Sequence, residues 1–171
     1  GLPLAAAVVA RAVSDAFAAG PEYFNTFGGN PACCAAGLAV LEAIEADGLR
    51  ANATRVSAEL RKGFERLMDL KGARCVVGDV RGRGLFLGVD LVTDAASKAP
   101  ATAEASWICA RLVTRHRILT SLDGPGDNVL VVKPPLCFSL SDAAEFLAAL
   151  EEGLVAANAL PAGFSFERTP T

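Results

Sequence analysis

The chain has 171 residues, of which 52% are hydrophobic and 20% are charged, a balance typical of a globular protein rather than a disordered one. Its net charge of −3, with no basic run interleaved with aromatic residues, argues against nucleic acid as a partner. The longest apolar stretch, at residues 2–10, is shorter than the roughly 20 residues that span a bilayer, so we expect no membrane partner. Because the sequence opens on glycine without an initiator Met, we expect a fragment or a processed chain.

The first 46 residues predict two helices around a glycine-rich loop. A short buried strand is expected over the first nine residues, and a helix should follow from about residue 8 or 10 to Ala19. After the stretch "YFNTFGG", Asn30 is suited to an N-cap and Pro31 to the first helical position. These two residues predict a helix from Pro31 to about Ala46.

The remainder predicts a mixture of helices and strands. An amphipathic helix is expected from Leu49 to about Leu70, and residues 75–92 are interpreted as one long strand preceded by a glycine-rich bend. We expect a helix over 101–115, and then strands at 117–121 and 128–135 joined by a turn at "DGPGD". A closing helix should begin with Ser139 or Ser141 as its N-cap.

This order of elements predicts an α+β fold, with a small, largely antiparallel sheet that carries helices on one face. Residues 1–46 do not fit that unit and are interpreted as the end of a different domain. We therefore expect a division into 1–46, a small domain at 47–158 and a flexible tail at 159–171.

The cysteines and the single histidine indicate the redox compartment and whether a metal site is expected. The five cysteines form no C-x-x-C pair, which favours reduced thiols in the cytosol or an organelle matrix. The single histidine, His116, offers too few nitrogens for a histidine-based metal site, so no metal site is predicted. Because arginines flank it on both sides, His116 is interpreted as a helix-end residue.

Three glycine-rich or basic motifs are candidates for anion binding. In "GDVRGRGLFLG", Gly82 and Gly84 precede a strand instead of opening a helix, which favours backbone bends over a nucleotide site. In "NTFGGNP", Thr26 and Gly28 lie just before a helix, so the motif is either an anion site or a glycine turn capped by asparagine. Lys133, ahead of two prolines, either binds an anion or simply extends its ammonium to solvent.

Three of these stretches, in this order and spacing, resemble one known family. "YFNTFGGNP", "VRGRGLFLGVDL" and "PPLCFS" with its following acidic helix are similar to the C-terminal part of class-III pyridoxal-phosphate-dependent aminotransferases. The resemblance covers roughly residues 1–155. "PATAEA" and "SLDGPGDNVLVVKPPLCFS" are most similar to the phospho-lyase branch, which acts on phosphoethanolamine or 5-phosphohydroxylysine, with alanine–glyoxylate aminotransferases as near neighbours.

The resemblance implies the fold and the site. It implies the small domain of a type-I pyridoxal-phosphate-dependent transferase plus the end of its large α/β domain, in a homodimer with active sites at the interface. Thr26 would then contact the cofactor phosphate held by the other subunit, with Phe27 and Gly28 beside it. Many family members have arginine before the paired prolines, where it binds a substrate carboxylate. Lys133 stands there in this chain and would bind substrate.

The same resemblance implies what the chain lacks. The Schiff-base lysine of the family lies a few residues before the position that matches Gly1, and none of the four lysines present occupies that position. We therefore expect no catalytic residue in the chain, which alone should be inactive. The parent enzyme would perform transamination, or phosphate elimination from a phosphorylated amine. The alternative is a non-catalytic dimerisation or interaction module.

Overall fold

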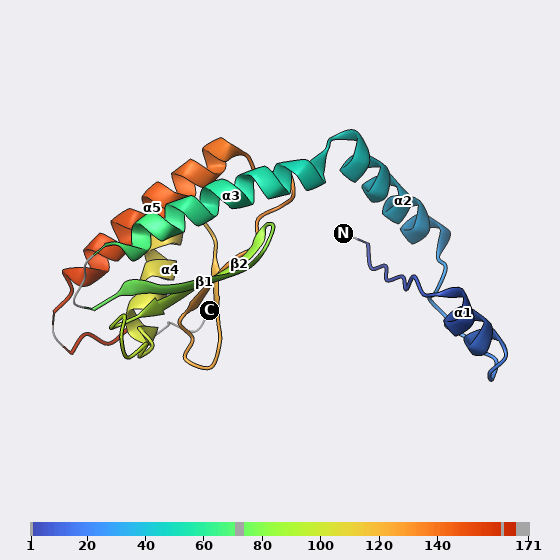
Figure 1. The fold of residues 1–171 in the computed structure, drawn as a ribbon, viewed down its shortest axis with the longest axis horizontal. Coiled ribbons are helices and arrows are strands. Elements are labelled where there is room, and N and C mark those ends of the chain that lie inside the picture. Colours follow the sequence, from blue (N-terminus) through green and yellow to red (C-terminus); the bar gives the residue numbers. More distant parts are fainter. Residues whose placement is uncertain (1, 71–73, 162, 167–171) are drawn as a thin grey trace. The chain divides into compact units, whose positions relative to one another are not determined.

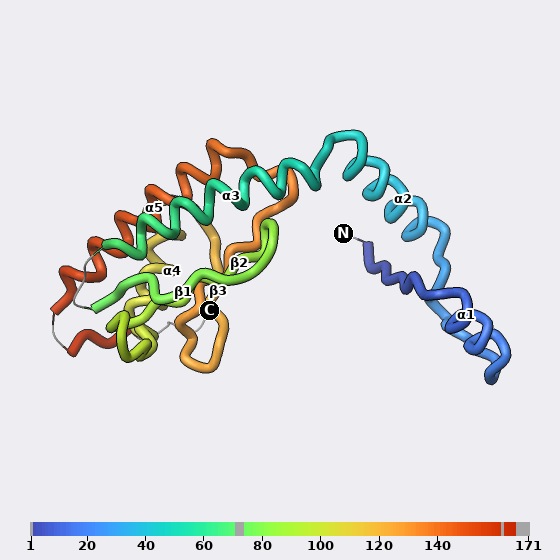
Figure 2. The backbone as a smooth tube through the Cα atoms, viewed as in Figure 1, coloured from blue at the N-terminus to red at the C-terminus, as the bar shows by residue number. Residues whose placement is uncertain are grey.

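The computed structural model describes residues 2–70, 74–161 and 163–166, and the chain divides into two compact units, Gly1–Gly48 and Leu49–Thr171 (Figure 1). Figure 2 follows the backbone through both of them. Part of the expected tail, at 162 and 167–171, lies outside the described residues. The division falls two residues beyond the expected one, and the assignment of the first unit to a large domain stays a prediction.

The first unit consists of two helices, α1 (Arg11–Ala18) and α2 (Pro31–Ala46), as the sequence predicts. Asn30 is the N-cap of α2: its Oδ1 accepts hydrogen bonds from the amides of Ala32, at 3.0 Å, and Cys33, at 3.1 Å. The expected strand over the first nine residues is wrong, since residues 2–10 form no strand. A strand needs a neighbour to pair with its backbone groups, and residues 2–48 contain none.

The second unit is a four-stranded sheet with three helices. Helix α3 (Leu49–Met68) precedes β1 (Val76–Arg83) and β2 (Phe86–Val92), and α4 (Thr102–His116) precedes β3 (Ser121–Asp123) and β4 (Val129–Val132). Helix α5 (Leu140–Asn158) closes the unit. The strand order is β1-β2-β4-β3 and every pair is antiparallel. This is the α+β architecture that the sequence predicts.

Two expected strands are corrected by the structure. Residues 75–92 form a hairpin of two strands, because Gly82 and Gly84 have φ values of +116° and +54° and turn the chain back. The strand expected at 117–121 begins only at Ser121. The amides of Arg117 and Ile118 instead donate to the carbonyls of Val113 and Leu112, and so close the end of α4.

The hydrophobic core lies between the sheet and the three helices of the second unit, which Figure 1 shows gathered against it. Strand β2 contributes Leu87, Val89 and Leu91 to this core, which alternate along the strand as the pleat requires. Phe64 of α3 meets them with no exposed surface, at an energetic gain of about 1.5–3 kcal/mol for such a side chain. The alternating residues, such as Gly88 and Asp90, lie on the opposite face of the sheet.

Two further sequence expectations concern membranes and thiols. Among the helices that the structure describes, none has both the length and the apolar character needed to cross a bilayer. All five cysteines are free.

Candidate functional site

A tight turn at Thr26–Gly29 holds three predicted site residues together, Thr26, Phe27 and Gly28. The turn is built by Asn25, whose Oδ1 accepts from the amides of Phe27, at 3.2 Å, and Gly28, at 3.1 Å. Gly29 follows with a φ of +69°, which leads the chain to the cap of α2. Phe27 is 88% exposed.

The turn offers one side-chain hydroxyl that can donate to a phosphate, that of Thr26. Asn25 and Asn30 together occupy the amides of residues 27, 28, 32 and 33. The Thr26 hydroxyl makes no hydrogen bond within the described part of the chain, so it is available. These residues therefore fit a pyridoxal-phosphate phosphate group through the Thr26 hydroxyl beside a helix N-terminus.

Lys133, the fourth predicted site residue, lies in the second unit, one residue after the end of β4. Its side chain lines a groove of about 820 Å³. Apolar side chains supply much of the wall: Ile118, Leu119, Val131, Phe138 and Phe146. The ionisable residues are His116, Arg117, Lys133, Asp142 and Glu145. An ammonium at the edge of an apolar groove suits an anionic group on a small molecule.

Two carboxylates fix the helices that form this groove. Asp142 accepts hydrogen bonds from the amide and hydroxyl of Ser139, both at 2.8 Å, which lower the pKa of the Asp142 carboxyl. Glu152 of α5 accepts from Nη2 of Arg111 at 2.6 Å and pairs with Nε2 of His116 at 2.8 Å. Arg111 is the main cause of the lowered pKa of Glu152. The end of α4, including His116, is thus held against α5 as a helix-end residue.

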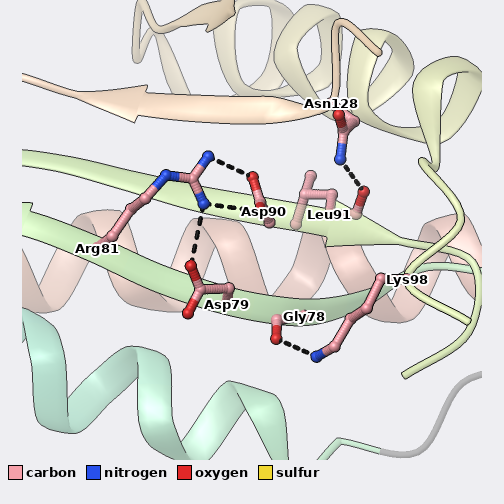
Figure 3. Close-up of polar contacts among 7 residues, drawn as sticks. All are labelled: Gly78, Asp79, Arg81, Asp90, Leu91, Lys98 and Asn128. Carbon is pink, nitrogen blue, oxygen red and sulfur yellow. Dashed lines mark hydrogen bonds and ion pairs between the residues drawn. The ribbon is translucent and has the colours of Figure 1, made fainter. Parts of the chain in front are cut away.

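The face of the sheet away from the core carries a polar cluster in which Arg81 pairs with two carboxylates (Figure 3). Arg81 donates to both oxygens of Asp90, at 2.7 and 2.9 Å, and to Asp79 at 3.0 Å, and these bonds raise its pKa above the usual range. Lys98 donates to the carbonyl oxygen of Gly78 at 2.6 Å. Asn128 bridges to Leu91. This cluster holds neighbouring strands together and supplies no unpaired catalytic acid or base.

The stretch "GDVRGRGLFLG" does not form a nucleotide-binding site. Its glycines are backbone bends, as the sequence predicts. Gly82 lies inside β1 and Gly84 in the hairpin turn, so neither opens a helix. Within the described residues no group of histidine, cysteine and acidic side chains could hold a metal ion. Burial raises the pKa of the Cys75 thiol to about 12, which keeps it protonated and unreactive at neutral pH.

Sequence reasoning missed two asparagines. Asn25 shapes the Thr26 turn, and Asn52 of α3 donates to the carbonyl oxygens of Leu136 and Phe138 after Lys133. The signal for Asn25 is its place three residues before the glycine pair, where asparagine favours turns. Asn52 contacts residues more than 80 positions away, and no local pattern indicates such a partner.

Comparison with known proteins identifies the family. A family model described as aminotransferase class III matches residues 1–154, most of the chain. The chain belongs to the class-III aminotransferases. An alanine–glyoxylate aminotransferase 2-like protein of Drosophila melanogaster is 43% identical over 157 residues, which cover 91% of this chain and 31% of that protein.

Solved structures of this family resemble the chain. A phospholyase from Arthrobacter, in complex with phosphoethanolamine, superposes with a TM-score of 0.76 and 37% identity, over 88% of this chain and 34% of that one. An amine transaminase from an uncultivated Pseudomonas species, in its PLP-bound form, gives a TM-score of 0.72 and 31% identity, over 86% and 34% of the two chains. These class-III relatives are enzymes, and the cofactor of the family is pyridoxal phosphate. The chain spans about a third of their length.

Proposed function

We propose that this chain is the C-terminal portion of a pyridoxal-phosphate-dependent class-III enzyme that acts on an amine or amino-acid substrate. The observation that carries the proposal is the exposed Thr26 hydroxyl, which has no hydrogen-bond partner among the described residues, in a turn where the amides of Phe27 and Gly28 are already taken. In the proposed homodimer this hydroxyl donates to the cofactor phosphate of the other subunit. When bound, pyridoxal phosphate supplies the electron sink for bond cleavage at the substrate α-carbon.

Lys133 binds the anionic end of the substrate in this proposal. Its ammonium is a compact point charge, whereas arginine presents a planar fork that matches a carboxylate in a bidentate manner. Lysine at this position loses the bidentate contact with a carboxylate, and it fits the phosphoethanolamine bound by the similar Arthrobacter phospholyase, which supports phosphate elimination. An assay of the full-length enzyme for phosphate release against amino transfer, with phosphoethanolamine as substrate, separates the two reactions. Free cysteines are consistent with a cytosolic or mitochondrial-matrix enzyme.

Cofactor binding by the full-length enzyme tests the role of Thr26. We expect Thr26→Ala to weaken pyridoxal-phosphate affinity by about 10- to 100-fold, because a hydrogen bond to a charged group is lost. Thr26→Ser keeps the hydroxyl and should stay within about threefold of the wild type. Equal affinity of Thr26→Ala and the wild type would remove Thr26 from the site.

Mixed dimers test whether Thr26 acts on the other subunit. One subunit carries Thr26→Ala and the other lacks the catalytic lysine that we expect upstream of this segment. If Thr26 acts across the dimer, one site in each mixed dimer combines an intact lysine with an intact threonine, and activity returns to about half of the wild type. If Thr26 acts within its own subunit, no site is complete and the mixture stays as impaired as Thr26→Ala.

A non-catalytic interaction module is the second candidate, favoured by the absence of any lysine from residues 1–48. Native mass measurement and cofactor titration of the 171-residue chain discriminate between the two. The enzyme proposal expects no saturable cofactor binding by this chain alone and tight binding by the full-length protein. A full-length protein that also fails to bind the cofactor would favour the module.

A further inference from the structure

The segment after Lys133 has unusually few backbone donors of its own. Lys133 follows the end of β4 and precedes Pro134 and Pro135, neither of which has an amide hydrogen. Each residue before a proline is confined to extended conformations, so the backbone of Lys133 is stiff. The direction in which the stiff segment leaves the sheet is then set by whatever holds its far end.

A single side chain from another element holds that far end. Nδ2 of Asn52, in the first turns of α3, donates one hydrogen to the carbonyl oxygen of Leu136, at 2.9 Å, and the other to that of Phe138, at 3.0 Å. Both amide hydrogens are therefore used on this segment. Phe138 also donates its own amide to the carbonyl of Pro135 at 2.9 Å, which closes a turn.

The orientation of the Asn52 amide is itself fixed. Nη2 of Arg55, one turn later in α3, donates to Oδ1 of Asn52 at 3.0 Å. An arginine only donates hydrogen bonds, so it identifies the accepting oxygen and leaves the amide nitrogen facing the loop. Arg55, Asn52 and the loop thus form a chain of contacts from α3 to the groove that Lys133 and Phe138 line.

We infer that Asn52 is a positioning residue for Lys133, through the loop that follows it. The inference rests on the proposed function, in which Lys133 binds the anionic group of the substrate. Strand β4 holds the chain before Lys133, and Asn52 holds the loop after it. The ammonium therefore stays at the groove, and substrate binding loses no entropy through ordering of this loop. Removal of the Asn52 amide frees the loop, and substrate affinity falls while the reacting groups stay intact.

The test compares two asparagines of similar structural role in the full-length enzyme. We expect Asn52→Ala to raise the KM for phosphoethanolamine about fivefold with kcat changed less than twofold. Asn158 is the matched control: its Nδ2 also donates to two carbonyl oxygens, those of Cys75 and Leu154, at 2.8 and 2.9 Å, and neither Asn158 nor these two residues line the Lys133 groove. Asn158→Ala also removes the acceptor of the Arg74 and Cys75 amides, so it should lower thermal stability at least as much and leave KM unchanged.

A double-mutant cycle with Lys133→Ala shows whether Asn52 acts through Lys133. We expect Lys133→Ala to raise KM by tenfold or more, and Asn52→Ala to raise it no further in that background. Additive effects, or an unchanged KM in Asn52→Ala, would overturn the inference while leaving Lys133 as the anion site. An unchanged KM in Lys133→Ala would overturn the substrate role of Lys133, and the inference with it.

Hydrogen exchange gives a readout that does not depend on catalysis. In the 171-residue chain, we expect Asn52→Ala to speed exchange at the Phe138 amide, which donates to Pro135, by about tenfold. The same amide should be unaffected in Asn158→Ala. Unchanged exchange at this amide in Asn52→Ala would show that the loop is held without Asn52 and would overturn the inference.

Discussion

Gly82 occupies a conformation that no other residue type can take without strain. Its φ is +116°, and a Cβ there would meet the Phe86 carbonyl oxygen and lie 2.9 Å from Cα of Leu87, both backbone atoms of the paired strand. Backbone atoms cannot rotate away as a side chain can. We expect Gly82→Ala to lower the free energy of unfolding by about 3 kcal/mol, measured by urea denaturation.

Gly84 provides the matched control for that prediction. Its φ is +54°, but nothing lies within 4 Å of a Cβ built there, so Gly84→Ala carries the conformational cost alone, about 1 kcal/mol. Equal losses in the two variants would contradict the contact with Phe86 as the cause. The glycines were predicted as bends from the sequence, because they precede a strand. That Gly82 pairs with Leu87, which brings it against the Phe86 carbonyl, depends on the register of the hairpin, and single-residue reasoning does not supply that register.

In the candidate site too, features set by neighbouring residues could be predicted from the sequence, and features set by distant residues could not. Thr26, Gly28 and the Asn30 cap were found from the sequence because their determinants are neighbours in the chain, and the structure brings them into one turn. Whether Thr26 binds the cofactor stays a prediction. The groove beside Lys133 combines residues from α4, β4 and α5, so its outline follows only from the tertiary fold.

Among the elements, the helices were predicted best, helped by capping side chains at the starts of α2 and α5. The closing helix α5 begins at a capping box: Ser139 Oγ accepts from the Asp142 amide at 3.1 Å, and Asp142 accepts from the Ser139 amide. Strands have no comparable signal, since a strand is defined by its partner. Residues 75–92 therefore looked continuous, although Arg83 pairs with Phe86 across a tight turn.

The capping box predicts a dependence of stability on pH. Hydrogen bonds from Ser139 lower the pKa of Asp142 in the folded state, so its ionised form contributes stability above the unfolded pKa, and this contribution disappears as pH falls through the folded pKa. We expect the stability difference between the wild type and Asp142→Asn to be largest at neutral pH and to shrink below about pH 4. Urea unfolding at pH 7, 5 and 3 measures it.

A second variant removes the Ser139 hydroxyl, the other side chain of the capping box. Ser139→Ala leaves the Asp142 amide without its cap and should cost about 1 kcal/mol at pH 7. In the Ser139→Ala background the pH dependence contributed by Asp142 should be weaker, because one of its two hydrogen bonds is gone. A pH dependence of full size in that background would contradict the assignment to the Ser139 hydroxyl.

At the scale of the whole chain, the two units differ in whether they have a core. Every buried residue that the structure describes lies between Val56 and Ala157, and neither α1 nor α2 buries a residue. Helix α2 exposes more than half of the side chains of Leu38, Val40 and Leu41. The first unit is therefore expected to gain its stability from a surface supplied outside this unit.

This difference predicts the outcome of dividing the chain at the unit boundary. Because the core draws only on the second unit, residues 49–171 should unfold cooperatively, with a free energy within about 0.5 kcal/mol of the value for the 171-residue chain. Residues 1–48 alone should show little helical circular dichroism, since helices of 8 and 16 residues are marginal without packing. The 171-residue chain should bind more of a hydrophobic dye than residues 49–171. A segment 49–171 that fails to fold would contradict the assignment of the core to the second unit.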